Sequence, residues 1–361
     1  MKTLRLALAA LLASAAVSAG AATIVLGGYP DQIQFIDDTD GTVEERITLD
    51  SGLPTNIQMS QDRKRIYITT YTTSGIEVMD AATRKIISRV SLNTPMTHYR
   101  FIGGVPDPTG RYFYILGDRF DKEIDSYRVG KPRFMVVDLK SGKVVRSAEL
   151  EPQDIAGMAY RARLAVSPDG KTLYAFQKKI LVVDIGDLKV VDRIDLEKPD
   201  FPDMMGVGIG GVLETIRKPG EYVSLFNAED PYIHNKVFGI ARFNLSSRTF
   251  TFDPIGPAPE QMAGLEVTPD GKEGYTVVVN GDLGSQRCEF WRFDLTTNAA
   301  VDKAEFPCRR RFYFGMSRDA QKLYIYGAGY DIAVYDAKTL KFEQDWELKN
   351  DITMAGMLTL P

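Results

Sequence analysis

Histidines, cysteines and arginines are the residues of this sequence whose chemistry is most informative. The two histidines, His98 and His234, and the two cysteines, Cys288 and Cys308, form no metal-ligand spacing. The sequence also contains no G-x-S-x-G, no phosphate-binding G-x-x-x-x-G-K-[ST] loop, no C-x-x-C and no haem-attachment C-x-x-C-H. We therefore expect no catalytic residue, no metal site and no cofactor held by this chain alone.

Six arginines are the strongest candidates for binding: Arg100, Arg161, Arg163, Arg309, Arg310 and Arg311. Clustered guanidinium groups bind carboxylates and phosphates through paired hydrogen bonds. Four ring-bearing residues fall in the same predicted region, namely His98, Tyr99, Tyr232 and His234. In the alternative interpretation the arginines are structural and pair with acids such as Asp154 and Asp203, and the ring-bearing residues serve packing or the surface.

Four acidic residues also lie close together in sequence: Asp118, Asp121, Glu123 and Asp125. Calcium binds several carboxylate oxygens, but the spacing here is not that of an EF-hand. Arg119 and Lys122 lie among the acids. A solvated, salt-bridged loop is therefore the favoured interpretation of this segment.

The elements that position these residues follow from a repeat. A hydrophobic strand that ends in Asp or Asn, followed by a polar turn and another strand, occurs seven times, ending at Asp37, Asp80, Asp138, Asp184, Asn244, Asp294 and Asp336. Asp and Asn side chains accept hydrogen bonds from backbone N–H groups in such turns. A second turn, clearest at Ser167-Pro168-Asp169-Gly170, precedes an apolar strand in most repeats. Each repeat therefore has strands A, B, C and D.

Seven four-stranded units at this spacing are typical of a β-propeller. We predict an all-β, seven-bladed β-propeller that forms a single domain over residues 22–361. The first unit starts at a B-like strand, Thr23–Gly27, and lacks an A strand, whereas Ile352–Leu360 is a surplus strand at the other end. The C-terminal strand is therefore expected to close the ring inside the first blade and to cover both exposed edges.

The strand order divides the connections between two faces. The short A–B and C–D turns share one face, and the B–C and D–A connections share the other. The longest repeat spacings are attributed to B–C insertions at Asp118–Gly130 and Asn227–Lys236. The six arginines come at the starts of A strands, so several are expected to converge on the channel mouth. Variable loops on a rigid scaffold commonly hold the function, so we place the site on the B–C/D–A face.

The N-terminus predicts export. Lys2 and Arg5 precede the apolar run Leu6–Val17, and Ala19-Gly20-Ala21 offers a cleavage site, so residues 1–21 are predicted to be a signal peptide. The run is short for a bilayer span, and we expect a soluble periplasmic or secreted protein without membrane insertion after cleavage. The formal charge of −4 gives no indication of a nucleic-acid partner.

The two cysteines of an exported protein are expected to pair. Cys288 opens the apparent strand Cys288–Leu295, and Cys308 follows the next one, Ala300–Phe306, after a turn around Thr296–Asn298. The two residues then lie nearly opposite each other across one hairpin, close enough for a disulfide. Two free buried thiols are the alternative.

Three segments, Ser91–Pro95, Ser167–Leu173 and Ala333–Leu340, are typical of a known group of propellers. With them, the whole mature chain resembles the YVTN-type propellers. Within that group it resembles the β subunit of quinohemoprotein amine dehydrogenase and, more distantly, the methylamine dehydrogenase heavy chain. The resemblance implies a subunit without a cofactor, which packs against a haem-bearing subunit and a small subunit with a tryptophylquinone and helps to wall the amine pocket.

The run Arg309-Arg310-Arg311 departs from this pattern, because aromatic residues are expected at the start of the late A strand. A positive cluster repels an ammonium substrate. No catalytic residue is therefore transferred from the family to this chain.

Three functional hypotheses follow. The first is a non-catalytic periplasmic subunit or scaffold of a redox complex, which docks partner proteins on its B–C/D–A face. The second is a stand-alone propeller that binds an anionic small molecule at an arginine-lined channel mouth. The third is a lactonase-like enzyme, which requires a metal cluster that this histidine-poor sequence disfavours.

Overall fold

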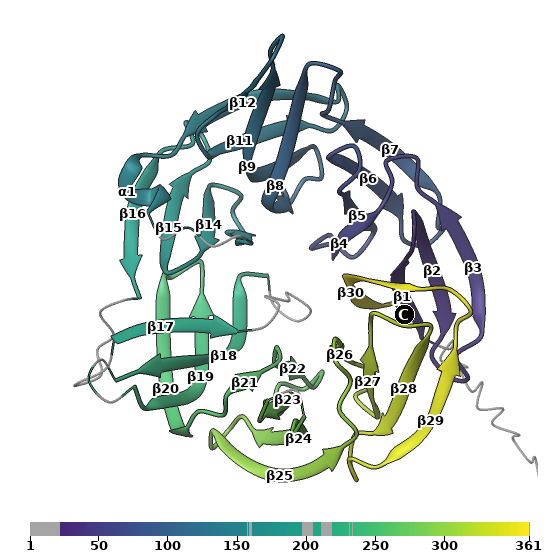
Figure 1. Ribbon diagram of the computed structural model, residues 1–361. Helices are drawn as coiled ribbons and strands as arrows, with labels where there is room; N and C mark the ends of the chain where they lie inside the picture. Colours follow the sequence, from purple (N-terminus) through teal and green to yellow (C-terminus); the bar gives the residue numbers. More distant parts are fainter. Residues whose placement is uncertain are drawn as a thin grey trace, which may run out of the picture.

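Seven antiparallel sheets stand in a ring around a central axis (Figure 1). This computed structural model describes residues 22–156, 158, 161–196, 205–210, 219–230, 232, 234–282 and 284–360. The predicted signal peptide, residues 1–21, lies outside them. Each sheet is one blade with strands A to D from the centre outward, so the predicted seven-bladed propeller is confirmed.

The first four blades contain the following strands, in order from the innermost to the outermost. Blade 1 contains β30 (Ile352–Leu360), β1 (Thr23–Gly28), β2 (Gln32–Asp37) and β3 (Val43–Thr48), and blade 2 contains β4 (Pro54–Met59), β5 (Arg65–Thr70), β6 (Gly75–Asp80) and β7 (Ile86–Ser91). Blade 3 contains β8 (Thr97–Pro106), β9 (Tyr112–Lys122), β11 (Arg133–Asp138) and β12 (Lys143–Glu149), with β10 (Tyr127–Val129) added at the end of β9. After the short helix α1 (Pro152–Ile155), blade 4 contains β13 (Arg163–Val166), β14 (Thr172–Phe176), β15 (Lys179–Asp184) and β16 (Val190–Asp195).

The last three blades follow the same order. Blade 5 contains β17 (Met205–Gly210), β18 (Glu221–Glu229), β19 (Lys236–Asn244) and β20 (Thr249–Pro257). In blade 6 two short strands, β21 (Gln261–Met262) and β22 (Glu266–Val267), take the innermost position, followed by β23 (Glu273–Asn280), β24 (Arg287–Asp294) and β25 (Ala299–Phe306). Blade 7 contains β26 (Tyr313–Met316), β27 (Lys322–Tyr326), β28 (Asp331–Asp336) and β29 (Phe342–Glu347).

The ring closes as expected. Strand β30 pairs antiparallel with β1, with Leu358 opposite Val25 and Leu360 opposite Thr23, and it takes the innermost position of blade 1. Its side chains also enter two cores, one shared with blade 2 and one shared with blade 7. Blade 1 is therefore assembled from both ends of the described chain.

The core consists of seven hydrophobic clusters, and each cluster lies between two neighbouring blades. The B and C strands are buried on both sides, which explains their nearly continuous apolar sequence. The outermost D strands are largely exposed, and in β12 exposed and partly buried residues alternate. Stability thus comes from blade-to-blade packing around the whole ring.

The seven predicted C–D turns are confirmed. In each blade strand C ends at the expected Asp or Asn, and its side-chain oxygen accepts a backbone N–H of the turn, for example 2.6 Å from Thr39 to Asp37 and 3.0 Å from Ser246 to Asn244. Hydrogen bonds from the turn lower the pKa of four of these carboxyls, those of Asp80, Asp138, Asp294 and Asp336.

The two predicted B–C insertions differ in structure. In Asp118–Gly130, β9 continues to Lys122 and turns back as β10, which forms a hairpin that projects from the ring (Figure 1). The extra length of blade 5 was attributed to Asn227–Lys236 alone, and this is incomplete. Strand β17 ends at Gly210 and β18 begins at Glu221, so additional residues also lie in the A–B connection on the opposite face.

Candidate functional site

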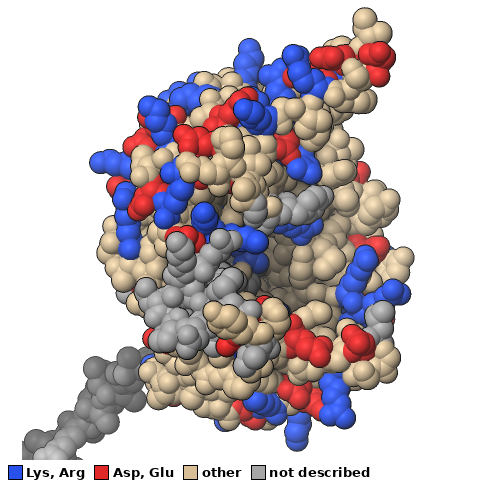
Figure 2. Space-filling view, turned by 60° about the vertical axis from the view of Figure 1, so that its left-hand side comes forward, with Lys and Arg blue, Asp and Glu red and all other residues tan. Residues whose placement is uncertain are grey.

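The innermost strands begin at the B–C/D–A face, and the predicted arginines lie at three of these starts. Arg100 lies within β8, Arg163 is the first residue of β13, and Arg161 precedes it by two positions. Arg309–Arg311 lie in the connection that crosses from β25 to β26. Lys and Arg side chains are visible at the edge of the hollow in the middle of the molecule (Figure 2).

Arg100 is a structural residue. It lies opposite Asp118 on the neighbouring strand β9, and the two side chains form an ion pair. The Asp118 side chain is 5 % exposed, so Arg100 neutralises a carboxylate that is almost removed from water. For Arg100, these contacts support the structural interpretation.

Arg309 is also held inside the protein. Its guanidinium binds Asp331 at the start of β28 through two hydrogen bonds, of which the Nη1–Oδ1 bond is 3.1 Å long. Asp345 on β29 lies 3.7 Å from the same guanidinium. This bidentate contact ties the connection before β26 to the two outer strands of its own blade.

Of the two acids named as partners for the arginines, only Asp154 lies among the described residues. Asp154 in α1 is buried and accepts two hydrogen bonds from Arg193 on β16, at 2.6 and 2.8 Å, so its expected pairing with the cluster was wrong. Asp203 lies outside the described residues.

Four arginines are left without a carboxylate among the described residues: Arg161, Arg163, Arg310 and Arg311. Arg161, Arg310 and Arg311 are exposed, whereas Arg163 is partly buried. Burial lowers the pKa of the Arg163 guanidinium, and the phenol of Tyr313 opposes this shift. Arg163 is the first residue of β13, the innermost strand of blade 4, and Tyr313 is the first residue of β26, the innermost strand of blade 7. The central channel lies between these two blades (Figure 1).

The four ring-bearing candidates are distributed over two blades. His98 is exposed on β8, and Tyr99 packs partly against the core between blades 2 and 3. In the blade 5 loop, Tyr232 is 84 % exposed, and Nδ1 of His234 lies 2.8 Å from Glu229. The contact with His234 lowers the pKa of the Glu229 carboxyl. None of these contacts brings the four rings together in one site.

The acidic segment of blade 3 is salt-bridged. Asp118 pairs with Arg100, Asp121 lies 2.9 Å from Arg119, and Glu123 lies 3.6 Å from Arg128. Hydrogen bonds from Arg119 and Thr97 lower the pKa of Asp121. In the part of the chain that is described, no three His, Cys, Asp or Glu side chains are grouped to hold a metal ion.

One feature of this face was missed in the sequence. Among the described residues, eight large hydrophobic side chains are more than half exposed on B–C and D–A connections: Tyr29, Tyr71, Met96, Ile124, Tyr127, Val129, Tyr232 and Tyr330. The other exposed large hydrophobic residues lie on outermost D strands, and the described A–B and C–D turns have none. The tyrosines in the B–C connections of blades 1, 2, 3, 5 and 7 were a signal available in the sequence.

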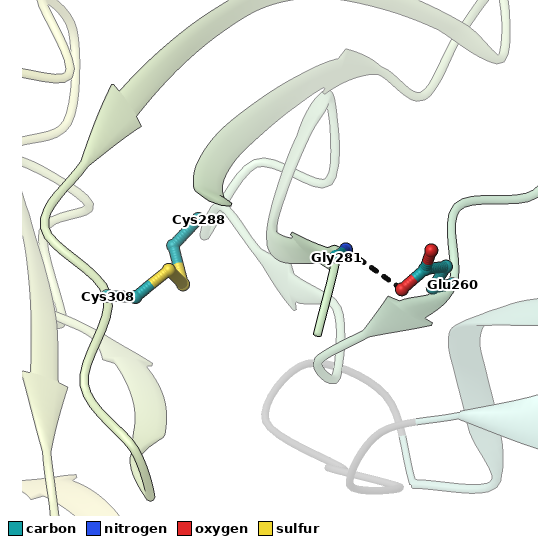
Figure 3. Close-up of a disulfide and its surroundings, with 4 residues drawn as sticks. All are labelled: Glu260, Gly281, Cys288 and Cys308. Atoms are coloured by element: carbon teal, nitrogen blue, oxygen red, sulfur yellow. Dashed lines mark hydrogen bonds between the residues drawn. A yellow bond between two sulfur atoms is a disulfide. The ribbon is translucent and has the colours of Figure 1, made fainter. Parts of the chain in front are cut away.

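The predicted disulfide is confirmed. Cys288 on β24 bonds to Cys308, with their Cα atoms 5.2 Å apart, on the same face as the Glu260–Gly281 hydrogen bond of blade 6 (Figure 3). It fixes the connection to β26 one residue before Arg309. A structural disulfide indicates an extracytoplasmic protein. No helix of the described residues is long and apolar enough to cross a membrane.

Comparison with known proteins gives the fold and no family. No family model matches the sequence, and no curated protein matches it. Among solved structures, the dihydro-heme d1 dehydrogenase NirN is similar with a TM-score of 0.54 and 14 % identity, over 93 % of this chain and 74 % of that one. The periplasmic gluconolactonase PpgL of Pseudomonas aeruginosa has a TM-score of 0.54 and 12 % identity, over 94 % and 99 %. AztD of Citrobacter koseri has a TM-score of 0.52 and 14 % identity, over 94 % and 98 %.

A dehydrogenase and a gluconolactonase share this architecture, so the likeness defines the chain as a seven-bladed propeller and does not define its activity. The finer resemblance to the amine dehydrogenase β subunit is not reproduced by any of these comparisons.

Proposed function

We propose that this chain is a non-catalytic, periplasmic scaffold subunit that docks a protein partner on its B–C/D–A face. The observation that supports this proposal is the one-sided distribution of exposed hydrophobic residues. Five of the eight exposed side chains in the loops are tyrosines, Tyr29, Tyr71, Tyr127, Tyr232 and Tyr330. Tyr and Arg are, with Trp, the residue types enriched among the residues that contribute most binding energy in protein interfaces.

The projecting hairpin is the most prominent part of this surface. Ile124 at its tip is fully exposed, and Tyr127 and Val129 on β10 are 61 % and 64 % exposed. A monomeric protein gains nothing from three exposed apolar side chains on one protruding hairpin, whereas an interface buries them. The salt bridges at its base, Arg100–Asp118 and Arg119–Asp121, hold the hairpin in place before the partner binds.

The chemistry of the face also constrains the partner. Arginines without a carboxylate partner in the described part of the chain share this face with exposed tyrosines, which matches a partner surface with carboxylates around apolar residues. The resemblance to amine dehydrogenase β subunits makes a redox subunit the partner in this proposal, one that itself carries haem or a tryptophylquinone.

The test is to purify the tagged chain from its own periplasm and to record both the composition and the visible spectrum of the eluate. We expect a stoichiometric complex with haem absorption. Replacing two hairpin residues, Tyr127→Ser with Val129→Ser, should abolish co-elution. The matched control is Ile87→Ser with Val191→Ser, because these side chains are 54 % and 57 % exposed but lie on outermost strands.

Two results would contradict the proposal. One is elution of the intact chain alone at physiological ionic strength. The other is equal loss of the partner from the hairpin variant and from the outer-strand control, which would show that any exposed apolar residue has this effect.

A further inference from the structure

Arg163 is the most unusual charged residue of the inner ring. It begins β13, it is partly buried, and it has no hydrogen-bond or ion-pair partner among the described residues. A guanidinium that loses water without gaining a carboxylate costs free energy. The other arginines of comparable position, Arg100 and Arg309, each have an aspartate. Among these three arginines, only the desolvated Arg163 therefore lacks a counter-charge in the described structure.

The surroundings of Arg163 are suited to an anion. Tyr313 begins the innermost strand of blade 7, and its phenol opposes the lowering of the Arg163 pKa that burial causes. A neutral phenol donates a hydrogen bond, as a guanidinium does. Arg161 lies two residues before Arg163, and Arg310 and Arg311 lie three and two residues before Tyr313; all three are exposed. The segments at the starts of β13 and β26 thus contribute two arginines each.

The segment with Arg310 and Arg311 is fixed in position. Immediately before it, Cys308 is bonded to Cys288 and Arg309 is bonded to Asp331. The two exposed arginines therefore extend from a connection that is anchored at two consecutive residues. A site that is ordered before binding loses less conformational entropy when the ligand arrives.

We propose that the channel mouth binds a small polyanion, with one anionic group between Arg163 and Tyr313 and further groups at Arg161, Arg310 and Arg311. Each guanidinium can hold a carboxylate or a phosphate through two parallel hydrogen bonds. Arginines from blades 4 and 7 approach the ligand from different sides of the ring. A compound with at least two anionic groups therefore satisfies the site better than a monoanion. The site does not depend on the docking of a protein partner.

Calorimetric titration of the purified chain tests the proposal, with citrate and pyrophosphate as probes and acetate as the monoanionic reference at constant ionic strength. We expect one saturable site for citrate or for pyrophosphate, and the tighter probe distinguishes a carboxylate ligand from a phosphate ligand. Acetate should bind at least about tenfold more weakly, because it leaves the second pair of arginines unused. Affinity should fall as salt increases.

Variants assign the roles. Arg163→Met should weaken binding about tenfold or more, and Arg310→Ala with Arg311→Ala should weaken the polyanion more than acetate. The double variant should keep the melting temperature of the wild type, because neither residue has a carboxylate partner in the described structure. Arg318→Ala is the matched control, since Arg318 is an exposed arginine in an A–B turn on the opposite face. It should bind like the wild type.

If Arg163→Met fails to fold, Arg163→Lys replaces it, because lysine keeps the charge and loses the paired donors. Three outcomes would overturn the site: no saturable binding of either polyanion, wild-type affinity in both Arg163 variants, or equal loss in Arg318→Ala. A melting temperature lowered by several degrees in Arg310→Ala with Arg311→Ala, with binding intact, would show that these arginines are structural.

Discussion

The two faces of the ring follow different rules. On the A–B/C–D face, an Asp or Asn side chain caps each of the seven C–D turns, and no described turn exposes a large hydrophobic residue. On the B–C/D–A face the connections differ in length, expose eight large hydrophobic residues and contain four arginines without a carboxylate among the described residues.

The difference shows how one repeat can serve two purposes. On the A–B/C–D face, the Asp and Asn side chains accept hydrogen bonds from backbone N–H groups of their own turns. The requirements of folding therefore determine which residues occur there. On the B–C/D–A face, the described residues leave large hydrophobic side chains exposed and four arginines without a carboxylate, and such surfaces commonly bind a partner or a ligand. Deletion, disulfide and turn-cap variants test whether stability and binding are separated in this way.

The largest effect is expected from deletion of Ile352–Pro361, which would remove the ring closure that both faces require. Ile352, Ala355, Leu358 and Leu360 on β30 are at most 7 % exposed, and their burial is worth several kcal/mol by area, about 25 cal/mol per Å². The deletion also exposes the edge of β1. We expect loss of cooperative urea unfolding and aggregation in size-exclusion chromatography. A truncated protein that stays monomeric and unfolds near the wild-type midpoint would show that the six other blades suffice.

The second prediction concerns the disulfide that fixes the connection to β26 on the B–C/D–A face. The disulfide encloses a sequence separation of 20 residues, and its loss in Cys288→Ala with Cys308→Ala should cost about 3 kcal/mol in urea unfolding. Non-reducing peptide mass spectrometry of the native protein should show the two cysteines linked. The outcome against the prediction is a double variant as stable as the wild type, in which case packing alone would order the connection to β26.

The smallest effect is expected from one turn cap. Asp336→Ala removes the acceptor for Thr339 and should cost about 1 kcal/mol. Tyr330→Ser, in the same blade but on the opposite face, should stay within about 0.5 kcal/mol of the wild type. If both substitutions lower the free energy of unfolding by the same amount, residues on the two faces contribute equally to stability, and the distinction between the faces is wrong.

The same cap gives a pH dependence with a defined sign. The folded pKa of Asp336 is lowered by hydrogen bonds from Thr339, so its stabilising contribution is complete above the ordinary value of 3.8 and is lost as the pH falls through the folded pKa. Asp336→Asn keeps the acceptor, as Asn244 does in blade 5, and should remove this part of the acid sensitivity. Urea unfolding midpoints measured from about pH 3 to about pH 6 test this, since that range spans the ordinary pKa of an aspartate. An Asp336→Asn protein with unchanged acid sensitivity would assign that sensitivity to other carboxyls.

The fold was predictable because its determinants are local and repeated. The Asp or Asn at the end of strand C marks every blade, and the surplus strand Ile352–Leu360 implies closure. Cys288 and Cys308 were predictable from the hairpin between them. The sequence did not predict which arginines have an acidic partner, because the partners are distant in sequence. Arg309 pairs with Asp331, and Asp154 pairs with Arg193 on β16.

Blade 5 shows a second limit of the sequence. A repeat spacing gives the total length added between two turns but does not say which connection contains it. The extra residues could therefore be placed in Asn227–Lys236, although part of them lies between Gly210 and Glu221. The direction of an insertion depends on where strands end, and that is decided by pairing across the blade.

The placement of β30 in blade 1 has a consequence for biosynthesis. A chain that emerges with its N-terminus first exposes β1 to β3 early, but the strand that completes their blade arrives only after blades 2 to 7 have been made. Throughout that interval the edge of β1 is open to pairing with other chains. A chaperone that acts on this protein would have its main task in the time between the synthesis of β1 and the arrival of β30.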